Sequence, residues 1–211
     1  ERARTAGTPL EGKSLDDMRE LTDFYRDIFG TLTACAARQL EESPFRRQDI
    51  ACATLLDEAN GYLHAKCRSA GLPVPVLETC HDGSYVSGDE AMLHYLVECL
   101  AGEALAVRQA AAAAGHETES ADGQKPASEN RLSFTAGREG DFISFCFIDY
   151  GRTITDEEMH DLFYPSSNGT GYIICRQIVR EHDEFFGHIG CRVNASHATP
   201  DGGGLTIVFT L

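Results

Sequence analysis

The segment DFISFCFID (residues 141–149) constrains the fold more than any other stretch of the chain. Both of its alternating faces are apolar, which is typical of a strand that lies near the centre of a sheet. The segment RLSFTA (131–136) precedes it across a short turn, so the two are predicted to form a hairpin. The core is therefore expected to form around a sheet that has this segment inside it.

The rest of residues 45–211 alternates between strand and helix patterns. Further strands are predicted at FRRQDI (45–50), VPVLETC (74–80), SYVSG (84–88), GCRVNA (190–195) and GGGLTIVFTL (202–211). Helices are predicted from Leu55 to a stop at Gly71, from a cap at Asp89 to about Val107, at 155–163 as a short helix or turn, and from Gly171 to Arg180. One mixed sheet with its helices on one face makes a two-layer α/β sandwich, which is the predicted fold class.

Residues 1–44 follow a different pattern. Residues 1–13 are expected to be a disordered lead-in, and Ser14 with Asp17 forms a capping-box signature for a helix that Pro44 ends. Apolar residues then recur at spacings of three and four, at Met18, Leu21, Tyr25, Ile28, Leu32 and Cys35. This pattern is typical of a coiled-coil seam, which needs a partner helix from an upstream segment or a second subunit. The alternative is that the helix packs on its own domain.

The charge and the cysteines limit the class of protein. A formal charge of -15 disfavours nucleic acid or an anionic membrane surface as the main partner. Eight cysteines without a CxxC pair indicate reduced thiols in a cytoplasmic setting rather than zinc ligands or disulfides. No apolar run approaches the length of a membrane span, so an inner-membrane anchor of a parent protein would lie outside these residues.

Two glycines, Gly169 and Gly171, stand at the start of the helix in NGTGYIICRQIVREH (168–182). A helix N-terminus carries unpaired N–H groups and partial positive charge, and a glycine turn lets an anion approach the backbone closely. Phosphate is the obvious candidate anion. The alternative is that both glycines are ordinary turn residues.

The order of these segments resembles the ATP-binding catalytic domain of sensor histidine kinases, which belong to the ATPases with the Bergerat nucleotide fold. The resemblance covers about residues 45–211 and is most specific in the second half. The chain looks closest to a Bacteroidetes branch of sensor proteins in which catalytic motifs are often eroded. The residues that carry the resemblance are Asp149, Gly151, Phe163, Pro165, Gly169, Gly171, Arg176, Ile178 and Val179.

The resemblance implies a base-recognition site at the end of the central strand. Asp149 would accept a hydrogen bond from the exocyclic amine of adenine, and Gly151 would let the backbone approach the base. Thr153 takes the place of the second glycine of this motif, which is a mild departure from the family. Together these three residues form the base half of the expected nucleotide site.

The resemblance places the triphosphate at the next helix. Gly169, Thr170 and Gly171 would bring the helix N-terminus against the phosphates. Glu103 stands where the family has an asparagine that ligates Mg²⁺, and a carboxylate oxygen can also bind magnesium. Without the metal, a negative charge about 4 Å from a phosphate costs about 4 kcal/mol at an effective dielectric of 20, so this departure is serious.

Two hypotheses follow for the function. In the first, the chain is the ATP- and Mg-dependent part of a two-component histidine kinase, and the γ-phosphate passes to a histidine outside the chain, since residues 14–44 contain none. In the second, it is a pseudokinase module that binds nucleotide weakly or not at all and acts through protein contacts. In both, the resemblance implies a homodimer formed by the 14–44 helix as the second helix of a dimerisation hairpin, and a response regulator as partner. A serine kinase of the anti-sigma type is disfavoured, because such kinases lack this helix.

Overall fold

The computed structural model describes residues 45–113, 130–164 and 170–211. Contacts divide the chain into two units, Glu1–Ser43 and Pro44–Leu211, and every described residue belongs to the second. The predictions for residues 1–44, Pro165 and Gly169 therefore lie outside the described residues.

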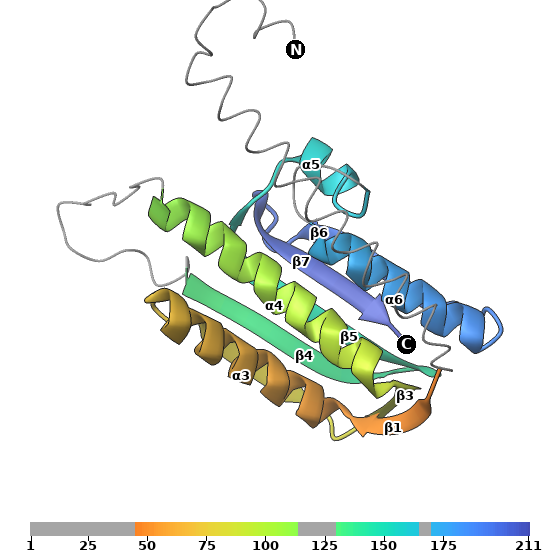
Figure 1. Ribbon diagram of the computed structural model, residues 1–211. Helices are drawn as coiled ribbons and strands as arrows, with labels where there is room; N and C mark the ends of the chain where they lie inside the picture. The colour runs from red at the N-terminus through yellow and green to blue at the C-terminus, as the bar shows by residue number, and fades with distance from the viewer. Residues whose placement is uncertain (1–44, 114–129, 165–169) are drawn as a thin grey trace, which may run out of the picture. The chain divides into compact units, whose positions relative to one another are not determined.

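Helices and strands alternate along the described part of the chain (Figure 1). The helices are α3 (Cys52–Ala70), α4 (Glu90–Ala113), α5 (Asp156–His160) and α6 (Gly171–Phe185). The strands are β1 (Arg47–Ala51), β2 (Val76–His81), β3 (Tyr85–Asp89), β4 (Arg131–Glu139), β5 (Phe142–Thr153), β6 (Arg192–His197) and β7 (Gly203–Thr210). The elements predicted for residues 45–211 are all present, although α3 begins earlier than predicted and α4 and α6 run further.

The main sheet has five strands in the order β2-β4-β5-β7-β6. The strand β5 is central, as its apolar sequence predicts, and it forms an antiparallel hairpin with β4 across the turn at Gly140 and Asp141. The edge strand β2 runs parallel to β4, so the sheet is mixed. The prediction of one sheet was wrong, because β1 and β3 pair only with each other in a separate two-stranded sheet.

Three helices form the second layer. In Figure 1, α3, α4 and α6 lie side by side across one face of the sheet. Residues on β5 alternate between buried and half-buried, so one face of this strand lies in the core and the other remains partly open. The two-layer α/β sandwich is confirmed.

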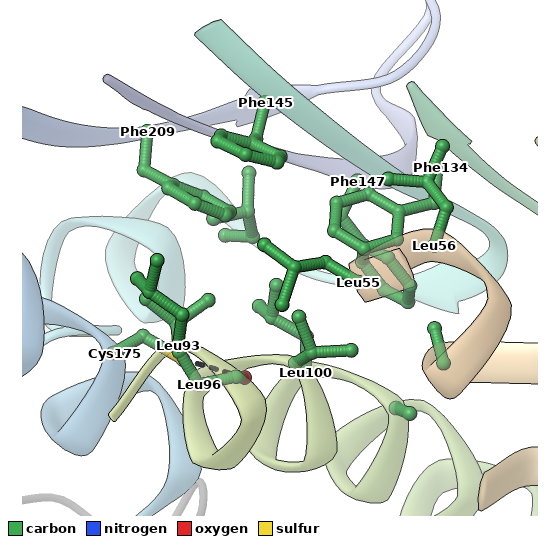
Figure 2. Close-up of a cluster of buried hydrophobic side chains, with 14 of the residues drawn as sticks. Leu55, Leu56, Leu93, Leu96, Leu100, Phe134, Phe145, Phe147, Cys175 and Phe209 are labelled. Carbon is green, nitrogen blue, oxygen red and sulfur yellow. Dashed lines mark hydrogen bonds between the residues drawn. The ribbon is translucent and has the colours of Figure 1, made fainter. Parts of the chain in front are cut away.

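Aromatic and aliphatic side chains from both layers form the core (Figure 2). The rings of Phe145 and Phe209, on neighbouring strands, stack with centroids 4.8 Å apart. Leu96 of α4 and Leu55 of α3 face them from the helix layer. Burial of these side chains supplies the main favourable free energy for joining helices to sheet.

The helix ends follow the sequence signals. Gly71 takes the left-handed conformation with φ 67° directly after α3, where a residue without Cβ is favoured. The carboxylate of Asp89 accepts a hydrogen bond from Met92 N–H at 3.1 Å, which is the predicted cap of α4. Thr155 and Glu158 cap each other at the start of α5. These local signals fix where α3 ends and where α4 and α5 begin.

A buried histidine joins the start of α4 to α6. His182 has 0% exposure, its Nδ1 lies 2.8 Å from Ile178 O, and its Nε2 accepts from Asp89 N–H at 3.1 Å. Because Nε2 is the acceptor, the ring is neutral and Nδ1 carries the hydrogen that is donated to Ile178. Burial lowers the pKa of His182, while the nearby acidic Asp89 and Glu181 oppose part of this shift.

The chain is therefore expected to lose stability as the pH falls below the usual histidine range. The unfolded chain takes up a proton at about pH 6.5, whereas folded His182 takes it up at lower pH, so the loss develops from about pH 6.5 down through the folded pKa. Thermal unfolding between pH 7.5 and 5 measures this loss. His182→Gln should show a flatter pH dependence, and the same change at exposed His160 should not.

Candidate functional site

The carboxylate of Asp149 is bound by a guanidinium. Arg108 Nη1 donates to Asp149 Oδ2 at 3.0 Å, and Nη2 donates to Oδ1 at 2.9 Å. The side chain of Asp149 is 1% exposed and that of Arg108 is 13% exposed. This is a bidentate ion pair largely removed from water, which is among the stronger polar contacts in proteins.

Backbone groups complete the surroundings of this ion pair. Asp149 Oδ1 also accepts from Gly151 N–H at 3.0 Å. Arg108 donates from Nη1 to Ala104 O at 2.7 Å and from Nε to Asn130 Oδ1 at 3.1 Å. Ala104 O and Asn130 Oδ1 therefore hold the guanidinium in addition to Asp149.

Strand β5 is irregular just beyond Asp149. Its register with β7 shifts between Asp149 and Thr153, and Thr153 itself is exposed and pairs with Gly203. Because of this irregularity, Asp149 and Arg152 both point into the interior although an odd number of positions separates them.

A second carboxylate lies against the start of α6. Glu103 Oε1 accepts a hydrogen bond from Gly171 N–H at 2.7 Å. A Cβ at Gly171 would lie 2.6 Å from the same oxygen, so the close approach requires glycine. The preceding Thr170 makes no side-chain cap. Glu103 therefore binds the N–H of Gly171, which was predicted to bind a phosphate.

An arginine and a tyrosine form a third contact. Arg152, 8% exposed, donates from Nη1 to Tyr172 Oη at 3.1 Å, and its guanidinium carbon lies 5.2 Å from the centre of the Tyr172 ring. Tyr172 is 1% exposed, and burial raises its pKa far above the usual range, with negative Glu103 and Asp149 adding to the shift. The arginine acts in the opposite direction.

These contacts bring the predicted residues together. Glu103 and Arg108 lie on the same helix, α4, and each reaches a different predicted position, Gly171 and Asp149. Arg152 of β5 also donates to Tyr172 of α6, so the end of β5, the start of α6 and the middle of α4 meet at one place. Gly169 lies outside the described residues. Among the described residues no group of three or more histidine, cysteine, aspartate or glutamate side chains is arranged to hold a metal ion.

The residues do not fit ATP and magnesium as they stand. The oxygens of Asp149 that would recognise adenine accept instead from Arg108 and Gly151. The N–H of Gly171 at the start of α6 is bound by Glu103. A nucleotide would have to displace two internal contacts before it could bind.

Two arginines of α6 lie on the exposed surface. Arg180 pairs with Glu184 at 2.9 Å, and Arg176 lies over the ring of Tyr164 with a weak bond to Phe163 O at 3.4 Å. The side chain of His94 on α4 is 30% exposed, and its Nδ1 lies 2.6 Å from Glu58 Oε1 of α3.

Sequence reasoning missed three contributions to the site. Arg108, Arg152 and Tyr172 were not among the predicted site residues. The sequence does contain a signal for Arg152. It is a basic residue three positions after Asp149, at the end of the predicted central strand and directly before Thr153. A basic residue at such a buried strand end needs a polar partner, and Tyr172 is one of the few in reach.

Comparison with known proteins gives a consistent result for the fold. The sequence matches no known family profile and no curated protein. Among solved structures, the catalytic domain of histidine kinase ThkA is similar with a TM-score of 0.53 and 14% identity over 79% of this chain and 96% of that one. The mycobacterial sensor histidine kinase MprB gives a TM-score of 0.54 and 18% identity over 79% and 97%. The Acinetobacter baumannii histidine kinase AdeS gives 0.60 and 12% over 100% and 89%.

The described part of the chain contains no helix that is both long and apolar enough to cross a bilayer. This chain has the fold of histidine kinase catalytic domains.

Proposed function

We propose that the chain is the ATPase-fold module of a sensor histidine kinase in which nucleotide binding is weak or absent, so that it signals through protein contacts. The fold supports the family assignment, and so do the contacts that join Asp149, Gly151 and Gly171 through α4 and Tyr172. The Arg108–Asp149 ion pair is the observation that favours weak binding.

An adenine base would have to compete with Arg108 for the carboxylate of Asp149. An adenine amine would give Asp149 one hydrogen bond from a neutral donor, whereas Arg108 already gives it two from a positively charged donor. If the base displaced the guanidinium, Arg108 would remain largely buried without its partner, which costs more free energy than one such bond supplies. Micromolar binding needs about 8 kcal/mol in favour of the complex, and both contacts of α4 work against it.

The second candidate is an active kinase that transfers the γ-phosphate of ATP to a histidine outside the chain. It is favoured by the position of Glu103, a magnesium-compatible carboxylate that lies at the start of α6. In both candidates the partners are proposed to be a second copy of the chain, joined through residues 14–44, and a response regulator. The proposed location is the cytoplasm.

Titration with Mg-ATP tests this choice. We expect millimolar Mg-ATP to shift the midpoint of thermal unfolding very little, because a ligand at or below its dissociation constant contributes at most about 0.4 kcal/mol. A shift of several degrees that requires magnesium would instead support the active kinase. A protein extended upstream by the first hairpin helix should then also acquire an acid-labile label from ATP.

A further inference from the structure

Helix α4 brings two opposite charges to the candidate site. Glu103 lies at the phosphate half, the start of α6, and Arg108 lies at the base half, the end of β5. Glu103 and Arg108 stand five positions apart, which corresponds to about 7.5 Å along a helix axis. Glu103 binds the backbone N–H of Gly171, and Arg108 binds the carboxylate of Asp149. One rigid element therefore contacts both the phosphate half and the base half.

Glu103 lies where an external anion such as phosphate would bind the start of α6. A helix N-terminus favours negative charge, and the 2.7 Å bond from Gly171 N–H to Glu103 Oε1 has the length of a charged hydrogen bond. The contact is so close that a Cβ at Gly171 would also lie 2.6 Å from Glu103 Cγ. The side chain thus lies directly against the backbone that a phosphate would have to reach.

Arg108 lies at the base half, where the amine of adenine would donate its hydrogen bond to Asp149. Ala104 O and Asn130 Oδ1 hold its guanidinium, and Asn130 in turn donates to Val74 O at 3.4 Å. Because these contacts come from residues other than Asp149, the guanidinium is already oriented for the bidentate bond. The base half is occupied by a group that the rest of the fold keeps in place.

We propose that Glu103 and Arg108 are internal ligands of the site and form a latch that excludes phosphate at one half and adenine at the other. The inference rests on the proposed function, because it gives the cause of the weak nucleotide binding. The two charges are opposite, so the latch occupies both halves with no net charge. Its removal should increase the affinity for a ligand of each half separately.

The experiment measures binding of inorganic tripolyphosphate and of adenosine by calorimetry. Glu103→Gln should bind tripolyphosphate at least tenfold more tightly than the unmodified chain and adenosine equally weakly, since it removes the negative charge from the phosphate half alone. Arg108→Lys should bind adenosine at least tenfold more tightly and tripolyphosphate unchanged, because lysine cannot form the bidentate bond. The matched controls are Glu98→Gln, an exposed carboxylate on the same helix, and Arg131→Lys, an exposed arginine; neither should change either affinity.

Both arms can overturn the proposal. If folded Glu103→Gln binds tripolyphosphate no better than the unmodified chain, Glu103 is not an internal ligand. If folded Arg108→Lys binds adenosine no better, Arg108 does not exclude the base. Should Arg108→Lys fail to fold, Arg108→Gln at the same position provides the measurement.

Failure of the proposed function gives a different result. A double variant that gains both tripolyphosphate and adenosine binding but still does not bind Mg-ATP would leave the latch standing and remove the nucleotide assignment. A gain of Mg-ATP binding in the double variant would support both. Strong Mg-ATP binding by the unmodified chain would overturn both together.

Discussion

Replacement of Asp149 by alanine should lower the free energy of unfolding by about 3–5 kcal/mol, because it leaves the guanidinium of Arg108 in the interior without its partner. The carboxylate is 1% exposed and accepts three hydrogen bonds, two from Arg108 and one from Gly151 N–H. Water can reach the guanidinium only in part, since its side chain is 13% exposed. Chemical denaturation monitored by circular dichroism measures the loss.

The matched control is the ion pair of Arg131 and Glu78. Its two side chains are 45% and 51% exposed, and the bond is 2.6 Å long. Exposed pairs contribute little, so Glu78→Ala should change the unfolding free energy far less than Asp149→Ala. If the two variants lose similar stability, the buried ion pair has no special structural role. A combined change of Asp149→Ala with Arg108→Met should recover much of the loss, since it removes the unpaired charge.

The second large effect is expected at Gly204. This residue is the second of β7, lies beside Asp149 and has φ 70°, a conformation that costs a residue with Cβ about 1–2 kcal/mol. A Cβ there would also lie 2.7 Å from Ala198 Cβ and 3.1 Å from the backbone oxygen of Asp149. Because the second neighbour is backbone, it cannot rotate away, and Gly204→Ala should destabilise the protein by about 2–4 kcal/mol.

Gly61 provides the comparison for this substitution. It lies inside α3, and a Cβ added there would meet nothing within 4 Å. Alanine favours helix over glycine, so Gly61→Ala should raise the unfolding free energy by about 1 kcal/mol. Opposite signs for the same chemical change would show that the Gly204 effect comes from its surroundings. If Gly204→Ala left the unfolding free energy unchanged, the start of β7 could shift to make room for the Cβ.

Much of the fold could be predicted because its signals are local. The apolar segment 141–149 identified the central strand, and Asp89 and Gly71 marked helix ends through their own hydrogen bonds and conformation. The separation of β1 and β3 from the main sheet could not be predicted. Strand partners depend on contacts between distant segments, and the alternation of residues does not encode them.

The site was predictable in position but not in its contacts. The order of motifs identified Asp149 and Gly171, and the structure brings both to the same helix, α4. The partners of these residues could not be read from spacing, because Glu103 and Arg108 each reach across from another element. The metal role predicted for Glu103 stays a prediction, since a carboxylate that binds Gly171 N–H is also compatible with other roles.

The buried phenol of Tyr172 gives the site an intrinsic optical probe. The chain has no tryptophan and seven tyrosines, so its ultraviolet emission comes from phenols alone. Tyr85 and Tyr164 are 62% and 50% exposed, whereas Tyr172 is 1% exposed and bonded to Arg152. A soluble quencher should therefore suppress the first two and spare the third. Tyr62, Tyr95 and Tyr150 are half-buried, so among the described tyrosines the emission most resistant to quenching would come from Tyr172 at the start of α6.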